Sequence, residues 1–223
     1  MINAQAWHEL IEELQPQGVT LVAVSKIKPV KDILSLYQLG QRDFGENYVQ
    51  ELVEKQALLP ADIRWHFIGH LQSNKVKMIA PFVHLIHGID SFRLLQEVNK
   101  QAMKHNRIID VLLQMHIAEE ESKFGLDEKE IFELLEYYEA QLDDMQNVRI
   151  CGLMGMSTAT DDTTQIRKEF QRLHGLYLNL KASTFLAKPY FNTCSMGMSD
   201  DYKIAVEEGS TMVRIGSMLF GRR

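Results

Sequence analysis

A lysine just after a predicted strand is the first residue in the sequence that could carry out covalent chemistry. Lys26 follows the apolar, β-branched run 19–24 by two positions, within the stretch AVSKIKP. If its side chain points into the centre of a barrel, partial desolvation lowers its pKa below the usual ~10.4. The neutral amine then becomes available for imine formation with a carbonyl compound. A surface lysine at the end of a strand is the alternative.

Small residues and hydroxyls near the end of the sequence form a second candidate group. The stretch 194–201 runs from a predicted strand into a helix and carries hydroxyls at Ser195 and Ser199. The last predicted strand is followed by Gly216, which allows close approach of a ligand to the backbone, and by Ser217. Barrels often build phosphate sites on the loops after strands seven and eight. Two ordinary small-residue turns are the alternative.

Charged residues lie close to this small-residue cradle in the sequence. Arg214 stands two residues before Gly216 on the predicted strand and is expected to point inwards, where its charge needs an acceptor. Glu46 or Asp43 could serve, and so could a ring nitrogen or carboxylate of a ligand. The acidic pair 200–201 opposes an anion site, but it can stabilise a helix dipole while facing outwards.

Polar residues after the second and third predicted strands supply further candidates. Asn47 ends the glycine turn FGEN at the start of a predicted helix, where asparagine commonly caps the helix. His66 and His70 are four residues apart, and His84 and His87 are three apart. Without a helix beneath them or a carboxylate partner, these spacings do not predict a metal site. We therefore predict that the protein binds no metal.

The lysine, the cradle and the inward arginine together indicate one ligand chemistry. An amine that forms an imine, a phosphate site and a buried cation suit a phosphorylated aldehyde. Pyridoxal 5′-phosphate has this chemistry, so the sequence predicts it as the cofactor, held as a Schiff base on Lys26.

The elements that must position these residues alternate between short strand-like runs and helical stretches. Repeated strand–helix units imply parallel strands joined by right-handed crossovers, and eight units favour a single closed α/β barrel, the (β/α)8 or TIM-like fold. Alternation by itself leaves an open doubly wound sheet as the alternative. The predicted strands are 19–24, 43–45, 64–68, 83–87, 110–117, 149–154, 190–193 and 211–215, and the predicted helices are 30–39, 47–58, 74–80, 91–105, 128–140, 161–182 and 200–208.

Composition narrows the class of protein. The 223 residues are 45% hydrophobic and 24% charged, which is typical of a soluble globular protein, and no linker divides them, so we expect one domain over 1–223. The net charge of −6 disfavours nucleic-acid binding. No apolar run reaches the roughly 20 residues that cross a bilayer, and no secretory signal is visible. Because two cysteines make no disulfide framework, we expect a cytoplasmic protein.

An acidic region stands out in the middle of the chain. Residues 119–146 include eleven acidic residues and two lysines, and Asp127 with Glu130 forms a plausible capping pair for the helix that follows. We expect a solvated outer helix face, with a docking surface for a basic partner as the alternative.

Several motifs together resemble the YggS/PROSC family of pyridoxal phosphate homeostasis proteins. The resemblance covers nearly the whole chain in the order of the family. The motifs are AVSKIKP (23–29), FGENYVQE (44–51), WHFIGHLQSNK (65–75), SKFGL (122–126), GLMGM (152–156) and SMGMSDDYKIAVEEGSTMVRIGSMLFGRR (195–223).

This resemblance implies a fold and a set of site residues. The fold is the alanine racemase N-terminal barrel, known as fold type III among pyridoxal-phosphate proteins. Lys26 would carry the Schiff base, Arg214 would lie near the pyridine nitrogen, and Asn47 would lie beside the ring. Ile27 departs from the family, where a polar residue is common. The phosphate would be bound at Ser195, Ser199, Gly216 and Ser217. The sequence does not say whether the Ser195 or the Ser199 hydroxyl reaches the phosphate, so both are kept with equal weight.

The resemblance also implies a carrier that buffers or delivers the cofactor, rather than an enzyme. Racemisation needs acid–base groups on both faces of the substrate, and Lys26 supplies one. In the racemases the other is a tyrosine from a second domain, which we expect to be missing because the sequence ends eight residues after Ile215. An arginine at the ring nitrogen also weakens the electron sink. The expected partners are pyridoxal-phosphate-dependent apo-enzymes, and the expected state is a monomer. A weak racemase or lyase using Lys26 is the alternative.

Overall fold

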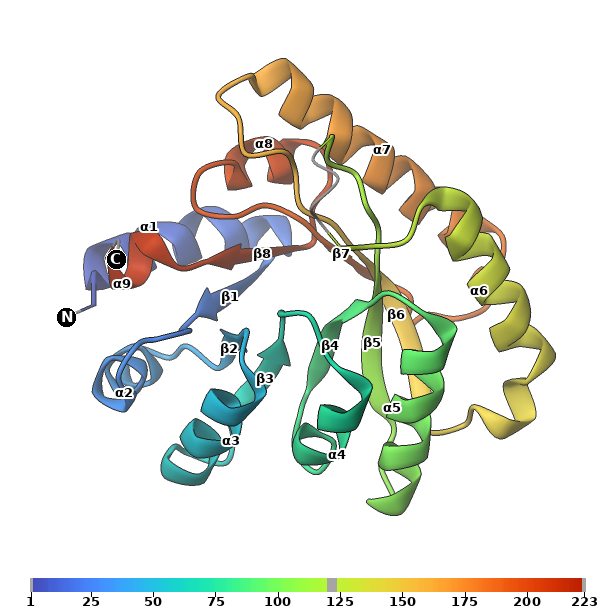
Figure 1. The fold of residues 1–223 in the computed structure, drawn as a ribbon. Coiled ribbons are helices and arrows are strands. Elements are labelled where there is room, and N and C mark those ends of the chain that lie inside the picture. The colour runs from blue at the N-terminus through green and yellow to red at the C-terminus, as the bar shows by residue number, and fades with distance from the viewer. Residues whose placement is uncertain (1, 120–123, 222–223) are drawn as a thin grey trace.

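Eight parallel strands close a barrel in sequence order, with the helices packed around the outside (Figure 1). The computed structural model describes residues 2–119 and 124–221. The first two residues of SKFGL and the last two of the C-terminal motif therefore lie outside the described residues. The predicted (β/α)8 barrel is confirmed, and the open-sheet alternative is excluded.

The strands of the barrel are short and almost wholly buried, as their consecutive apolar residues predict. In the register between β8 and β1, Arg214 lies opposite Val22, and β7 joins β8 at Ser195. The carboxyl ends of β7, β8 and β1 are therefore neighbours. The strands are β1 (Thr20–Val24), β2 (Asp43–Glu46), β3 (Arg64–Phe67), β4 (Leu85–Ile89), β5 (Ile109–Gln114), β6 (Val148–Met154), β7 (Thr193–Ser195) and β8 (Met212–Ile215).

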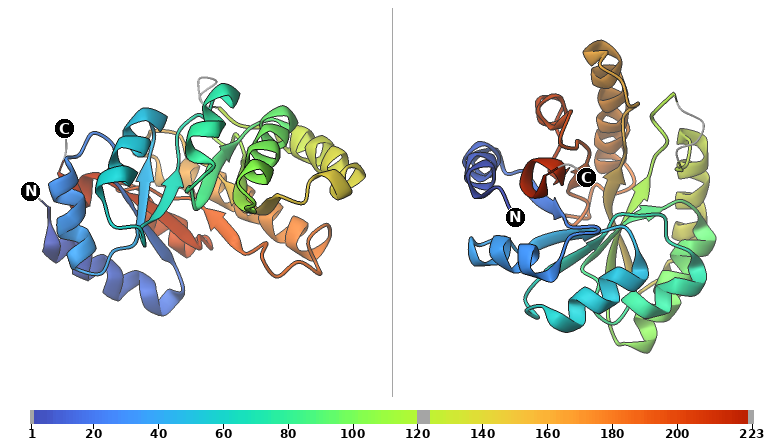
Figure 2. Two further views of the ribbon diagram at one scale, coloured as in Figure 1. Left: turned by 90° about the horizontal axis from the view of Figure 1, so that it is seen from below. Right: turned by 60° about the vertical axis from the view of Figure 1, so that its left-hand side comes forward.

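The helices lie around the outside of the barrel in the turned views (Figure 2). Their buried apolar residues pack into the hydrophobic core. The α-helices are α1 (Ala4–Leu14), α2 (Val30–Gln38), α3 (Val49–Leu58), α4 (Val76–Ile79), α5 (Phe92–Lys104), α6 (Glu128–Ala140), α7 (Thr163–Ala182), α8 (Tyr202–Glu207) and α9 (Ser217–Phe220). Short 3-10 helices lie at Gln15–Gln17, Ser73–Lys75 and Leu142–Asp144. No helix in the described ranges has the length and hydropathy that crossing a bilayer requires.

Helix α1 is missing from the predicted elements. It begins at an Asn3 cap, whose side chain accepts a hydrogen bond from the Ala6 amide, and it buries Trp7, Leu10 and Leu14. That apolar spacing was the available signal. Helix α1 lies beside α9, so segments from opposite ends of the sequence pack together (Figure 1).

The predicted strand 190–193 is wrong in position. Strand β7 begins only at Thr193, because the aromatic residues before it pack under α7 instead. The Phe191 ring stacks on Phe185 at a centroid distance of 4.1 Å and on Tyr177 at 5.4 Å. Aromatic residues favour strands, but here burial against a helix takes precedence.

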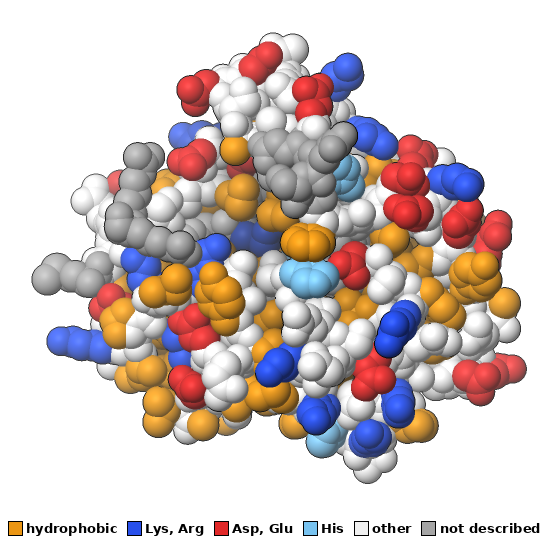
Figure 3. All heavy atoms as spheres, viewed as in Figure 1, with side chains coloured by type: hydrophobic (Ala, Val, Ile, Leu, Met, Phe, Trp, Pro, Cys, Tyr) orange, Lys and Arg blue, Asp and Glu red, His pale blue; other side chains and the backbone are white. Residues whose placement is uncertain are grey.

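The acidic region forms an outer face on α6, and acidic side chains gather over this helix in the space-filling view (Figure 3). Its apolar stripe is buried, whereas Glu133, Glu136 and Glu139 are exposed. The predicted capping box is present: Asp127 accepts from the Glu130 amide, and Glu130 accepts from the Asp127 amide. The solvated face is confirmed among the described residues.

Candidate functional site

Lys26 lies at the carboxyl end of β1, on the wall of a cavity of about 310 Å³. Gly216, just after β8, and Ser217, at the start of α9, also line it, so the cavity joins the lysine to residues nearly two hundred positions later in the chain. The other lining residues are Val24, Lys28, Asp200, Gly216, Ser217 and Gly221. The structure thus brings together the lysine and the glycine–serine pair that the sequence singles out.

A buried ion cluster, which we call the Lys55 clamp, holds the backbone just before Lys26. Lys55 Nζ donates to Glu46 Oε1 at 2.7 Å, to Glu51 Oε1 at 2.6 Å and to the Ser25 carbonyl at 2.7 Å. Ser25 Oγ also donates to Glu46 Oε1. Burial raises the pKa of Glu46, and the Lys55 ammonium opposes that shift. The clamp is not among the predicted site features, although Glu51 and Lys55 have helical spacing.

The residue after Lys26 is held in an unfavourable backbone conformation. Ile27 has φ +61°, a left-handed value that β-branched residues rarely adopt. Such a conformation costs about 1–3 kcal/mol and persists only where the surroundings enforce it. Here the Ile27 amide donates to Glu51 Oε1 at 2.6 Å, so the same clamp fixes both neighbours of Lys26. The Lys55 clamp therefore fixes the backbone on both sides of Lys26.

Asn47 does not cap α3, so the capping alternative is wrong. The cap position is Tyr48, which makes no side-chain cap bond. Asn47 Oδ1 is instead buried without a hydrogen-bond partner, as is Glu46 Oε2, among the atoms of the described residues. Unsatisfied buried acceptors are costly and need an explanation, and a missing ligand is one.

The structure separates the two serines that the sequence leaves equivalent. Ser195, the last residue of β7, is fully buried, and its Oγ accepts from Arg214 Nη1 at 2.7 Å. Ser199 lies on the following loop, where its Oγ accepts from the Gly216 amide at 3.3 Å. Ser195 thus belongs to the barrel interior, and Ser199 to the loop beside the glycine that lines the cavity.

Arg214 points inwards, as expected, but its predicted acidic partners are wrong. Its Nη1 donates to the Ser195 carbonyl at 2.9 Å as well as to Ser195 Oγ, and its Nη2 donates to the Gly155 carbonyl at 3.0 Å. Burial lowers its pKa to about 10, so it remains a cation at neutral pH. These contacts use three of the five N–H groups of a guanidinium. The remaining donors can serve an acceptor from outside the protein.

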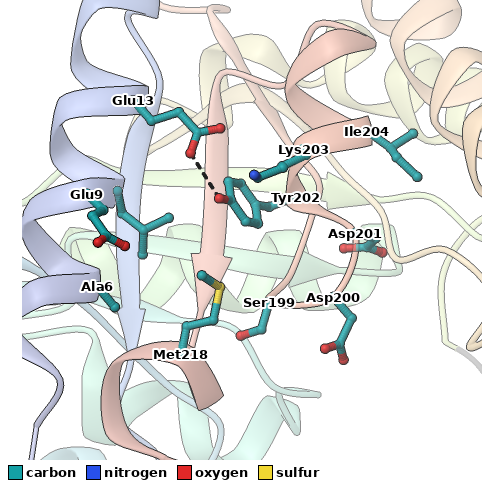
Figure 4. Close-up of a pocket in the computed structure, with 11 residues that line it drawn as sticks. Ala6, Glu9, Glu13, Ser199, Asp200, Asp201, Tyr202, Lys203, Ile204 and Met218 are labelled. Carbon is teal, nitrogen blue, oxygen red and sulfur yellow. Dashed lines mark hydrogen bonds between the residues drawn. The ribbon is translucent and has the colours of Figure 1, made fainter.

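The two aspartates after Ser199 differ from one another. Asp200 is exposed on the cavity rim, whereas Asp201 is buried, so the outward orientation is wrong for Asp201. Asp201 Oδ1 accepts from the Met198 amide and Oδ2 accepts from Ser157 Oγ, each at 2.6 Å, which fixes the loop. Figure 4 shows the adjoining cavity of about 410 Å³, where Tyr202 donates to Glu13.

The histidines gather at the amino end of the barrel, with a carboxylate that the sequence analysis missed. Ligand atoms of Asp43, His66 and His84 lie within 4.8 Å of one another. The Asp43 carboxylate is already paired with Arg64, whose Nε donates to Oδ1 at 2.7 Å. Burial would raise the pKa of Asp43, but hydrogen bonds from His66 and Arg64 outweigh it and hold the pKa far below its usual value. Arg64 therefore supplies the positive charge at this position.

His70 stands apart from the other histidines, beyond the carboxyl end of β3. Its Nδ1 lies 3.2 Å from Asp90 Oδ2, and the ring of Phe124 stacks on it at a centroid distance of 4.3 Å. The spacing of His66 and His70 therefore does not form a common site.

Comparison with known proteins first defines the class. The profile of the alanine racemase N-terminal domain family matches residues 3–223. Alanine racemase from Bartonella henselae superposes with a TM-score of 0.67 at 17% identity, over 96% of this chain and 58% of the racemase. That from Streptomyces coelicolor gives 0.78 at 15% identity, over 100% and 59%. At such identities the likeness shows the shared barrel.

Nearer relatives define the family within that class. The pyridoxal phosphate homeostasis protein of Pasteurella multocida is 39% identical, over 100% of this chain and 94% of its own length; that of Vibrio alginolyticus is 42% identical, over 93% and 88%. PipY of Synechococcus elongatus, solved with pyridoxal phosphate bound, superposes with a TM-score of 0.85 at 34% identity, over 98% and 99%. The chain belongs to the YggS/PROSC family of pyridoxal phosphate homeostasis proteins, as its motifs predict.

Proposed function

We propose that this protein binds pyridoxal phosphate on Lys26 and works as a carrier that buffers or delivers the cofactor. The observation that supports this most strongly is the Lys26 amine on the wall of the cavity it shares with Gly216 and Ser217. The cavity volume of about 310 Å³ falls at the lower end of the range for small-molecule sites. Relatives over nearly the full length bear the name of pyridoxal phosphate homeostasis protein.

The phosphate would lie on the small-residue loops. Gly216 has no side chain to exclude a ligand, and the Ser217 amide and hydroxyl follow it at the cavity wall. Ser199, whose Oγ touches the Gly216 amide, is the serine that we assign to the phosphate. We assign Ser195 instead to positioning Arg214, because its hydroxyl oxygen already accepts a hydrogen bond from Arg214 inside the barrel.

The ring would lie between Arg214 and Asn47. Arg214 retains N–H groups beyond its three contacts to Ser195 and Gly155, and these can donate to a ring nitrogen. The buried, unpartnered Asn47 Oδ1 offers an acceptor for a hydroxyl of the ring. The residues present therefore fit the group.

Each residue has a definable task around the cofactor, whose aldehyde combines reversibly with a primary amine. Lys26 supplies that amine, and the Lys55 clamp fixes its backbone. Because Arg214 is a permanent donor, it keeps the ring nitrogen unprotonated, which weakens carbanion chemistry. This favours holding the cofactor over turning over a substrate, with apo-enzymes in the cytoplasm as recipients and a monomer as the working form.

Absorption spectroscopy tests the site. Purified protein titrated with pyridoxal phosphate should develop a visible band, and borohydride should fix the cofactor on the Lys26 peptide, as read by mass spectrometry. Lys26→Ala should lose both, whereas Lys31→Ala, an exposed lysine on α2, should keep both. A band that survives in Lys26→Ala would refute the assignment.

A second assay separates carrier from enzyme. The loaded protein should restore activity to a pyridoxal-phosphate-dependent apo-enzyme, and chiral chromatography should find no rapid formation of D-alanine from L-alanine. Racemisation at about 1 s⁻¹ or faster, within the range of ordinary enzymes, would overturn the carrier assignment.

A further inference from the structure

Five buried polar side chains form a continuous chain across the interior of the barrel, which we call the barrel relay. Arg214 Nη1 donates to Ser195 Oγ at 2.7 Å, and that oxygen lies 3.2 Å from His87 Nδ1. His87 Nε2 lies 3.0 Å from His66 Nδ1, and His66 Nε2 lies 3.0 Å from Asp43 Oδ1. The five come from five different strands, and none is more than 7% exposed.

One set of hydrogen-bond directions joins the two ends of the barrel relay. Ionised Asp43 can only accept, so His66 Nε2 carries the proton. In this set of directions, His66 Nδ1 accepts from His87 Nε2–H. Burial lowers the pKa of His87 well below its usual value, and the nearby positive charge of Arg214 adds to this effect, so His87 is neutral. Its bare Nδ1 must accept from the Ser195 hydroxyl.

This arrangement determines how Ser195 meets Arg214. The Ser195 hydroxyl donates its hydrogen bond to His87 Nδ1, so towards Arg214 its oxygen acts only as an acceptor. Together with the Gly155 carbonyl on Nη2, this acceptor fixes the plane of the guanidinium group and hence the direction of its unused N–H groups. An unanchored hydroxyl could rotate its proton towards Arg214, and the acceptor would be lost.

We propose that His87, acting through Ser195, is a positioning residue that aims Arg214 at the ring nitrogen of pyridoxal phosphate, with His66 and Asp43 fixing the tautomer of His87. The inference rests on the proposed function, since it assumes that the ring nitrogen meets Arg214. It adds three residues from the amino half of the barrel that do not touch the cofactor. Their influence should therefore appear in the electronic state of the bound ring.

The first test needs no cofactor. Imidazole ¹⁵N chemical shifts of the apo-protein should report the Nε2–H tautomer for both His87 and His66. A proton on Nδ1 of His87 would overturn the inference, because Ser195 would then be free to donate elsewhere.

The second test uses the protein loaded with pyridoxal phosphate. His87→Leu removes both relay contacts and should shift the absorption maximum of the bound cofactor and raise its Kd about tenfold, the loss expected for one hydrogen bond to a charged group. His87→Asn retains an acceptor near Ser195 and should recover most of both changes. Ser195→Ala breaks the same link and should shift the band in the same direction, which keeps the test usable if His87→Leu does not fold.

His84→Leu is the matched control, since His84 lies next to His66 but outside the barrel relay. It should leave the band and the Kd at their wild-type values. Wild-type protein that carries the cofactor on Lys26, with His87→Leu indistinguishable from His84→Leu, would refute the relay alone. Wild-type protein that does not bind the cofactor on Lys26 would instead refute the proposed function.

Discussion

The two ends of the barrel are built from the same eight strands, yet they treat polar groups differently. At the amino end, charges are paired within the protein: Arg64 with Asp43, and Arg149 with Asp110. At the carboxyl end, Asn47 Oδ1 and Glu46 Oε2 are buried and have no hydrogen-bond partner among the described residues, and Arg214 keeps N–H groups beyond its three contacts. Buried polar groups without hydrogen-bond partners are costly. Their concentration at the carboxyl end therefore indicates that a ligand-binding site lies at this end.

Breaking the Lys55 clamp, beside Lys26, should cause the largest loss of stability. Lys55→Met leaves buried Glu46 without its cation, and breaking a buried pair costs about 3–5 kcal/mol of unfolding free energy. Urea denaturation measures the loss. Lys129→Met, in an exposed pair with Glu133, is the control and should change stability little. Equal effects of the two substitutions would show that the clamp is not a structural centre.

The second-largest effect is expected from the close packing of Gly69 against the Asn47 backbone. A Cβ on Gly69 would lie 2.2 Å from the Asn47 carbonyl oxygen, so Gly69→Ala forces the backbone apart at a cost of about 1–3 kcal/mol and should weaken cofactor binding. Gly175 is exposed on α7, and a Cβ there meets nothing within 4 Å, so Gly175→Ala should stabilise the helix by about 0.5–1 kcal/mol. Thermal unfolding should therefore move in opposite directions, and a shared direction would contradict this.

The pH dependence of stability should separate two members of the barrel relay, His87 and Asp43, because they lose their contributions in different pH ranges. The pKa of His87 and that of Asp43 are both lowered in the folded state, so each contribution is present above the unfolded pKa and is lost on acidification. For His87 the loss begins below ~6.5, and for Asp43 only below ~3.9. Between pH 7 and 5, wild-type unfolding free energy should fall more steeply than that of His87→Leu. Parallel curves would show that His87 is not held neutral by the fold.

The smallest effect is expected at the amino end. Arg149→Met removes a partly exposed pair with Asp110 and should cost about 1 kcal/mol or less. It should leave the Kd for pyridoxal phosphate unchanged, because the pair lies outside the barrel relay. A change in Kd beyond twofold, measured by absorption titration, would mean that the two ends are coupled more widely than we infer.

Much of the fold followed from local patterns, and the errors have identifiable causes. The alternation of apolar runs and helical stretches predicted all eight strands, and α6 was placed at its observed bounds. The strand predicted at 190–193 exists but begins only at Thr193, because Phe191 packs on Phe185 instead, a contact that the local apolar pattern does not reveal. The capping role of Asn47 failed because Tyr48 takes the cap position, one residue later.

The sequence by itself determined which residue types stand at the strand ends: Lys26, the serines at 195 and 199, and Gly216 after an inward Arg214. These residues belong to local motifs and to periodic patterns of neighbouring residues, so they can be identified from the sequence. Only the tertiary structure decided that Ser195 faces Arg214 while Ser199 faces Gly216, that Lys55 fixes the backbone at Lys26, and that His87 joins His66 to Ser195. Those contacts join residues that lie on different elements of the barrel, between 17 and 108 positions apart along the chain. Their geometry depends on how the strands pack, which no single segment of sequence specifies.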